Sequence, residues 1–281
     1  MTNMKQNMPI ISLILAAVVL NLVSALSKLD YLWSVLFVLG GLSFLLSIAT
    51  FKNQRVSRND LKLFFGFYIF SNIMTLALEM VMLKFNVWGF THHTFNLTGF
   101  TLLDAPIEEY VYWSFCPIIV GLSYINISRG LAESVSVEPA IITKLAELLK
   151  TVQLKTQSPR ADSVNYVDPQ NEVNGQYKQG AKYPVYIWVQ ILIIVAIIAM
   201  ARYFHGSYKA LAATAVIFFA VAFPHEAYAV THGFWIYNTQ HLIGPFIGPI
   251  PIEGYFMYFI SPICGGMMLD LADRKFFKQD V

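Results

Sequence analysis

Charged residues and cysteines are both scarce in this chain of 281 residues. Only 13% of the residues are charged and the formal net charge is +2, so no basic surface for a nucleic acid is indicated. The two cysteines, Cys116 and Cys264, are too few for a disulfide framework and lack the spacing of a metal site. Both lie in apolar runs, which favours buried, unreactive thiols.

Several motifs of cofactor-dependent enzymes are also missing. The chain has no Gly-x-Gly-x-x-Gly segment and no P-loop, so no flavin, nicotinamide or nucleotide site is predicted. The six histidines lack ligand spacing, which argues against zinc and against a di-iron hydroxylase. We therefore expect neither a cofactor nor a metal.

Hydrophobic residues, in contrast, make up 56% of the chain and aromatic residues 15%. A mean hydropathy of +0.55 is typical of membrane proteins rather than soluble domains. Apolar runs of spanning length occur at residues 9–27, 31–51, 63–86, 106–128, 184–202, 208–232 and 251–270. The sequence thus predicts an all-α integral membrane protein with about seven transmembrane helices. We interpret the first run as a span rather than a cleavable signal peptide.

One short motif occurs twice, each time where an apolar run begins. The first copy is Pro106-Ile107-Glu108-Glu109-Tyr110, followed by Pro117, and the second is Pro251-Ile252-Glu253-Gly254-Tyr255, followed by Pro262. Both the motif and the second proline are offset by 145 residues (251 − 106 and 262 − 117). Pro106 and Pro251 suit the first turn of a helix, whereas Pro117 and Pro262 predict a kink within each span.

A glutamate and a tryptophan upstream of the motif repeat in the same order. Glu79 lies nine residues before Trp88, and Glu226 lies nine residues before Trp235. Carboxyl groups inside hydrophobic spans are costly and usually functional. Their repetition in step therefore favours a duplicated unit that builds one acidic site.

The repeats divide the chain into four parts. Residues 1–30 form an extra N-terminal helix, 31–128 the first three-helix repeat, 129–183 a polar insertion with a short amphipathic helix, and 184–281 the second repeat. Three-span units in tandem are expected to be inverted, which would place the two tryptophan loops on opposite sides. Lysine and arginine mark the 51–62 loop as cytoplasmic. This charge rule conflicts with the span count, because the basic C-terminal tail then falls on the outer side.

The glutamates of the repeated segments are our candidate catalytic residues: Glu79, Glu108, Glu109, Glu226 and Glu253. A carboxyl group in a low-dielectric pocket tends to stay protonated, because burial disfavours its charged form. A neutral acid beside an ionised one is the arrangement that acid–base isomerisation needs. The alternative role is structural, since a glutamate directly after a proline also stabilises a helix start.

Aromatic side chains gather near the same segments, and six of them are candidate substrate-binding residues: Trp88, Tyr110, Trp113, Trp235, Tyr255 and Tyr258. Their faces would stabilise a carbocation by cation–π attraction, worth roughly 0.5–2 kcal/mol per ring. Anchoring at the membrane interface is the alternative role, above all for the two repeated tryptophans.

These segments resemble the lycopene cyclase domain family, the integral-membrane type that needs no flavin. The resemblance rests on an acidic residue, a Gly-x-Trp-x-Tyr-like segment at residues 233–237 and the Pro-Ile-Glu motif. It covers most of residues 63–128 and 208–270. Gly254 departs from the family pattern, which has a second glutamate at this position, and leaves room for a water molecule.

The resemblance implies a redox-neutral cyclisation of the ψ end groups of lycopene or a related linear carotenoid. Glu108 or Glu253 would be the acid, Glu109 would assist, and no cofactor would take part. The hydrophobic polyene would enter from the bilayer, and association with other carotenoid enzymes would be compatible with this role. The expected location is the cytoplasmic membrane of a bacterium or an archaeon.

Other functions are compatible with parts of the pattern. A carotenoid hydratase or a cyclase of longer carotenoids would use the same acids, with water beside Gly254. An inverted-repeat transporter with glutamates as proton relays is the alternative from a different class, although few polar residues line the other spans. A retinal-binding receptor is disfavoured, because the run 251–270 contains no lysine.

Overall fold

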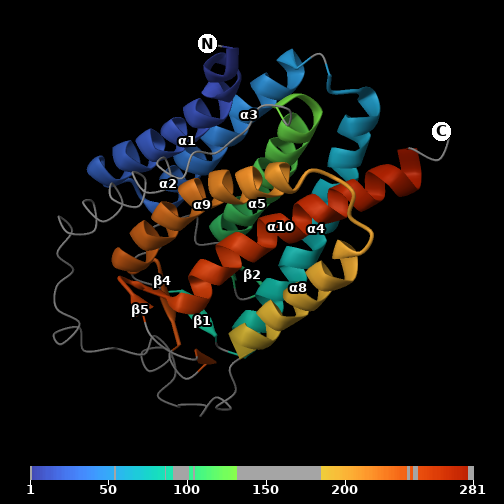
Figure 1. Cartoon of the computed structure of the whole chain (residues 1–281). Helices are drawn as coiled ribbons and strands as arrows, with labels where there is room; N and C mark the ends of the chain where they lie inside the picture. Colours follow the sequence, from blue (N-terminus) through green and yellow to red (C-terminus); the bar gives the residue numbers. More distant parts are fainter. Residues whose placement is uncertain are drawn as a thin grey trace, which may run out of the picture.

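The computed structural model describes residues 2–53, 55–85, 87–90, 101–103, 105–131, 185–238, 241–242 and 246–277. Its helices, labelled as in Figure 1, are α1 (Thr2–Leu26), α2 (Tyr31–Val35), η1 (Leu36–Gly40), α3 (Gly41–Lys52), α4 (Arg58–Lys84), α5 (Ile107–Asn126), η2 (Ile127–Leu131), α8 (Val185–Ala201), α9 (Tyr208–Thr231) and α10 (Ile252–Phe277). The segments α2, η1 and α3 follow one another without a break and form one helical rod.

Each predicted apolar run coincides with one of these helices or rods. Five are long and apolar enough to cross a membrane: Tyr31–Lys52, Arg58–Lys84, Ile107–Arg129, Tyr208–Thr231 and Ile252–Phe277. The segments Ser12–Leu26 and Val185–Ala201 are apolar but shorter. The seven predicted helices are thus confirmed, whereas full spanning length is shown for five of them.

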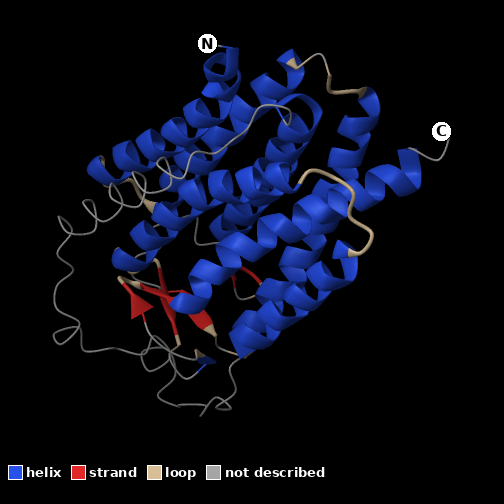
Figure 2. Cartoon of the chain, viewed as in Figure 1, coloured by secondary structure: helices blue, strands red, loops and turns tan. Residues whose placement is uncertain are grey.

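Short β-strands correct the purely helical prediction. They are β1 (Trp88–Phe90), β2 (Thr101–Leu102), β3 (Ala105–Pro106), β4 (Trp235–Tyr237), β5 (Phe246–Ile247) and β6 (Ile250–Pro251). Strands β2 and β3 form a small hairpin before α5, and β5 and β6 form its equivalent before α10. All strands gather at one end of the helical bundle (Figure 2).

The pairing of β1 with β4 joins the two repeats. Its antiparallel register is Trp88↔Tyr237, Gly89↔Ile236 and Phe90↔Trp235. The two outer pairs are repeat equivalents of each other. Trp88 corresponds to Trp235 and Phe90 to Tyr237, because 235 − 88 and 237 − 90 are both 147. The ladder is therefore self-complementary, with an approximate twofold relation about the central pair.

This pairing places both tryptophan loops at one end of the bundle, so the prediction that the repeats are inverted is wrong. Helices α4 and α9 both end at these strands, and α5 and α10 both begin there. The span count failed because the chain leaves the first repeat and enters the second at opposite ends of the bundle. Arg129 lies at the far end from the strands, whereas Tyr186, at the start of α8, packs against Trp88 with ring centroids 5.7 Å apart.

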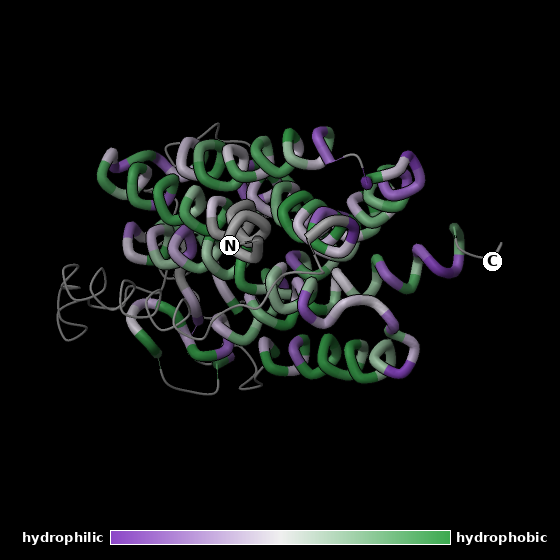
Figure 3. Tube along the Cα trace, turned by 45° about the horizontal axis from the view of Figure 1, so that its top comes forward, coloured by the Kyte–Doolittle hydropathy of each residue, from purple (hydrophilic) through white to green (hydrophobic). Residues whose placement is uncertain are grey.

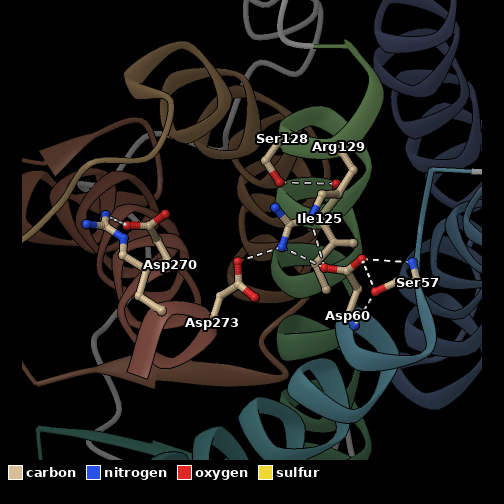
Figure 4. A network of polar contacts seen from close by, with 8 residues as sticks. Ser57, Asp60, Ile125, Ser128, Arg129, Asp270 and Asp273 are labelled. Carbon is tan, nitrogen blue, oxygen red and sulfur yellow. Dashed lines mark hydrogen bonds and ion pairs between the residues drawn. The ribbon is translucent and has the colours of Figure 1, made fainter. Parts of the chain in front are cut away.

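At the far end, Arg129 ties helices of both repeats together (Figure 4). Its Nε donates to Asp60 Oδ1 on α4 at 2.8 Å, and its Nη2 donates to Asp273 Oδ2 on α10 at 2.6 Å. Arg274, the repeat equivalent of Arg129 (274 − 129 = 145), pairs instead with Asp270 within α10. The basic tail thus lies at the same end as the 51–62 loop, and the charge rule agrees with the observed topology.

Helix starts and packing follow from the sequence. Ser57 and Ser207 cap α4 and α9 by accepting the backbone N–H three residues later. Helices α5 and α9 lie at the centre and are the most buried of the five spans, with Pro117 inside α5 as predicted. Outer helices such as α8 have exposed apolar side chains, as expected of a lipid-facing surface, and hydrophobic residues colour much of the helical bundle green in Figure 3. The predicted amphipathic helix lies outside the described residues.

Candidate active site

A cavity of about 60 Å³ lies between the two repeats, at the strand-bearing end of the bundle. The first repeat contributes Trp88, Phe90, Glu109, Tyr112 and Trp113, and the second contributes Tyr186, Phe218, Glu226, Tyr237, Met257, Tyr258 and Ser261. Two of the predicted acids therefore face one space that is lined largely by aromatic rings. A space of this size holds a few water molecules.

Glu226 is held by two tyrosine hydroxyl groups. Tyr237 donates to its Oε1 at 2.5 Å and Tyr258 donates to its Oε2 at 2.6 Å. Burial, and next the charge of Glu226, raises the pKa of Tyr237 well above its ordinary value, so this phenol remains a neutral donor. Two phenol donors on one carboxyl group favour its ionised form, which accepts hydrogen bonds and donates none.

Glu109 lies in the first turn of α5, where its side chain accepts a hydrogen bond. The donor is the hydroxyl of Tyr31, 2.6 Å from Oε2. Both residues are almost completely buried. Glu79 and Glu226 lie close enough to Glu109 to repel it when charged, and neighbouring buried carboxyl groups do not all ionise together.

Glu79 occupies the position in α4 that Glu226 occupies in α9. The indole nitrogen of Trp88 donates to its Oε1 at 3.0 Å, whereas its buried Oε2 has no hydrogen-bond partner among the described residues. Trp113 lies beside the carboxyl groups of both Glu79 and Glu109, but its indole nitrogen makes no hydrogen bond of normal geometry within the part of the chain that the structure describes. Glu79 therefore lies next to the cavity without lining it.

Glu108 and Glu253, the repeated glutamates of the motif, are buried but do not line the cavity. They lie in the first turns of α5 and α10. Gln190 on α8 donates to the backbone oxygen of Glu253 at 2.6 Å, which joins the first and third helices of the second repeat. Of the two adjacent acids in the first motif, it is Glu109 that reaches the cavity.

The repeated tyrosines of the motif hold the hairpins. Tyr110 donates to the backbone oxygen of Leu102 at 2.6 Å, and Tyr255 donates to that of Ile247 at 2.7 Å. Both hydroxyls are exposed and both bonds span eight residues. Neither tyrosine lines the cavity, in contrast to Trp88, Trp113 and Tyr258 among the predicted substrate-binding residues. The side chain of Trp235 lies outside the described residues.

The space beside Gly254 is filled, so the prediction of room for a water molecule there is wrong. A Cβ atom at this position would lie 2.7 Å from Cγ2 of Ile250. Real Cβ contacts are not this short, and the hairpin residue Ile250 is itself completely buried. The second repeat therefore has no space for a glutamate equivalent to Glu109.

Sequence reasoning missed several aromatic residues of the site, Phe90 and Phe218 among them. Tyr31, Tyr186 and Tyr237 contact the acids or line the cavity, and His225 stacks on Tyr112 with ring centroids 5.4 Å apart. Tyr237 lies inside the Gly-Phe-Trp-Ile-Tyr segment, so the sequence motif could have identified it as a site residue. Tyr31 and Tyr186 begin the first helix of each repeat, a correspondence that no motif marks.

A family model described as lycopene cyclase matches residues 30–125 and 182–271. The two matches coincide with the two structural repeats and together cover more than half of the chain. Comparisons with curated proteins and with solved structures gave no match. The long apolar helices and the family together indicate an integral membrane protein. The chain belongs to the lycopene cyclase family.

Proposed function

We propose that this protein closes the ψ end group of lycopene, or of a related linear carotenoid, into a six-membered ring without net oxidation or reduction. Membership of the family supports a carotenoid cyclase-like function. The observation that carries the specific proposal is the presence of Glu109 and Glu226 in one aromatic-lined cavity. We expect the protein in the cytoplasmic membrane of a bacterium or an archaeon, with the polyene arriving from the bilayer.

Glu109 is the general acid in this proposal. Its protonated carboxyl group adds a proton to the terminal double bond of the substrate, and the carboxylate of Glu109 remains. The neighbouring double bond attacks the resulting tertiary cation, so one carbon–carbon bond forms and the positive charge moves into the new ring. This assignment replaces Glu108 and Glu253 as the acid, because those residues do not line the cavity.

Glu226 is the general base. Its carboxylate, held by Tyr237 and Tyr258, removes one proton from a carbon beside the cation and leaves a ring double bond. One proton has then entered and one has left, so substrate and product are isomers. Transfer of the proton from Glu226 back to Glu109 restores the starting state without a cofactor.

Aromatic faces protect the cation between these two steps. Tyr112, Trp113 and Phe218 line the same cavity, and each ring face attracts a cation by roughly 0.5–2 kcal/mol. The mostly apolar lining of the cavity disfavours a water molecule beside the cation, which favours proton loss over hydration.

Pigment analysis of a lycopene-accumulating bacterium that expresses the chain tests this function. The wild-type chain is expected to yield a cyclic carotenoid, and Glu109→Gln and Glu226→Gln are each expected to reduce its formation at least a hundredfold. Glu108→Gln is the comparison, since it changes the adjacent buried acid. Loss of activity in Glu108→Gln with activity retained in Glu109→Gln would return the acid role to Glu108. Unchanged lycopene with the wild-type protein folded in the membrane would refute the cyclase.

A further inference from the structure

Tyr31 contacts the proposed acid from outside the repeated motifs. It is the first residue of α2, its side chain has no exposed surface, and its hydroxyl donates to Glu109 Oε2 at 2.6 Å. The bond links residues 78 positions apart in the sequence. Helix α2 thereby contributes directly to the site that α5 and α9 build.

The ring of Tyr31 is fixed by its neighbours. It packs against His225 and Phe234, with ring centroids 5.7 and 5.4 Å away. Ser34 Oγ donates its only proton to the backbone oxygen of Tyr31 at 2.7 Å and lies 3.0 Å from His225 Nε2. The contact between Ser34 and His225 holds α2 against α9 beside the Tyr31 ring. Tyr31 cannot swing its hydroxyl away from Glu109 without disturbing this cluster.

We propose that Tyr31 is a positioning residue that decides which oxygen of Glu109 carries the transferred proton. The proposal rests on the acid role of Glu109 given above. Because Oε2 accepts the Tyr31 hydroxyl, the acidic proton of the neutral carboxyl group lies on Oε1, the oxygen left to face the cavity.

The same hydrogen bond also favours the reaction step. When Glu109 gives up its proton it becomes a carboxylate, and a hydrogen bond to a charged acceptor is roughly twice as strong as one to a neutral acceptor. The Tyr31 contact is thus stronger in the transition state than in the ground state. Such a difference raises kcat, whereas binding of the polyene is unaffected.

Tyr31→Phe removes the hydroxyl and keeps the ring, and Tyr228→Phe is its matched control. The Tyr228 hydroxyl donates to the backbone oxygen of Leu29 at 2.5 Å, close to the start of the same helix, and Tyr228 does not line the cavity. With membrane-reconstituted protein and lycopene, Tyr31→Phe should lower kcat roughly ten- to a hundredfold with KM within about twofold. Tyr228→Phe should leave both constants unchanged.

Two further measurements separate positioning from a merely structural role. In a Glu109→Asp background, where the shorter side chain no longer reaches Tyr31, Tyr31→Phe should cause no additional loss of kcat. In infrared spectra, the C=O stretch of protonated Glu109, identified by its loss in Glu109→Gln, should move to higher wavenumber in Tyr31→Phe and stay in place in Tyr228→Phe.

The outcomes distinguish this proposal from the cyclase proposal. A wild-type protein that forms no cyclic product would overturn both. Normal wild-type turnover with undiminished kcat in Tyr31→Phe, an equal loss in Tyr228→Phe, or a full additional loss in the Glu109→Asp background would overturn the role of Tyr31 alone.

Discussion

Glu109 and Glu226 face the same cavity from different repeats, although they are not repeat equivalents. The equivalent of Glu226 is Glu79, which bonds to Trp88 beside the cavity, and the equivalent of Glu109 is Gly254. A nearly symmetric scaffold therefore carries an asymmetric pair of carboxyl groups. This asymmetry suits a reaction in which one group gives a proton and another takes one.

Loss of either tyrosine hydroxyl that donates to Glu226 should slow the removal of a proton from the substrate. A hydrogen bond to a charged group contributes about 1.5–3 kcal/mol, so Tyr237→Phe and Tyr258→Phe should each reduce kcat by about tenfold or more. Tyr203→Phe, which changes an exposed tyrosine at the far end, is the control. Initial rates of cyclisation in lipid vesicles would measure the effect, and full activity in both variants would contradict the role of these phenols.

Alkaline conditions should not remove the Tyr237 hydrogen bond. Burial raises the pKa of Tyr237 above its ordinary value of about 10, so its deprotonation is shifted to higher pH and the neutral donor persists below pH 10. A pH profile of kcat for wild type and Tyr237→Phe should show the same alkaline limb up to that pH. An alkaline fall near pH 8 in wild type that disappears in Tyr237→Phe would show that the phenol ionises earlier.

Filling the space of Gly254 should destabilise the protein. In Gly254→Ala the new methyl group meets Ile250 at 2.7 Å, and overpacking of this kind costs typically 1–3 kcal/mol. Gly66→Ala is the control, because nothing lies within 4 Å of a Cβ atom there and alanine favours a helix by about 1 kcal/mol. Thermal unfolding in detergent would compare the two variants, with equal melting temperatures as the contrary result.

The two repeat-equivalent arginines should differ in their contribution to stability. Arg129→Met leaves two buried aspartates, Asp60 and Asp273, without their partner, which costs up to about 3–5 kcal/mol before allowance for the partly exposed arginine. Arg274→Met removes one pair within a single helix, worth about 0.5 kcal/mol. Unfolding free energies would test this order, and the reverse order would show that Arg129 does not join the repeats.

The common orientation of the repeats can be tested by cross-linking. Gly89 and Ile236 lie directly opposite each other in the ladder, where Cα atoms are about 4.5–5.5 Å apart and within disulfide range. The double variant Gly89→Cys, Ile236→Cys should form an intramolecular disulfide under mild oxidation. The pair Lys52→Cys, Ile236→Cys joins opposite ends and should not. Inverted repeats would give no cross-link in either.

The sequence was sufficient for the helices, the duplication and the burial of the glutamates, because each leaves a local pattern. It was insufficient for choosing between Glu108 and Glu109. Consecutive helical residues point about 100° apart, so packing against the neighbouring helices decides which of them reaches the cavity. The role of Tyr31 could not be predicted for a related reason. A single tyrosine at a helix start belongs to no sequence motif, and only the packing of α2 against α5 brings it to Glu109.

The direction of the second repeat also required the structure. Counting apolar runs predicts the side of each loop from the number of runs alone, and this count placed the two tryptophan loops on opposite sides. The charge distribution already favoured one basic end, with Arg58 and Arg274 together. The β1–β4 pairing shows that the charge distribution, rather than the span count, was the better guide.

The self-complementary register of β1 and β4 bears on the ancestry of the fold. Equivalent residues of the two strands pair with each other in both directions. A separate three-helix unit could therefore bind a second copy of itself through this strand, as in an isologous dimer. Such a dimer would carry every acid twice. In this single chain the two halves differ at that position, with Glu109 in one half and a tightly packed Gly254 in the other.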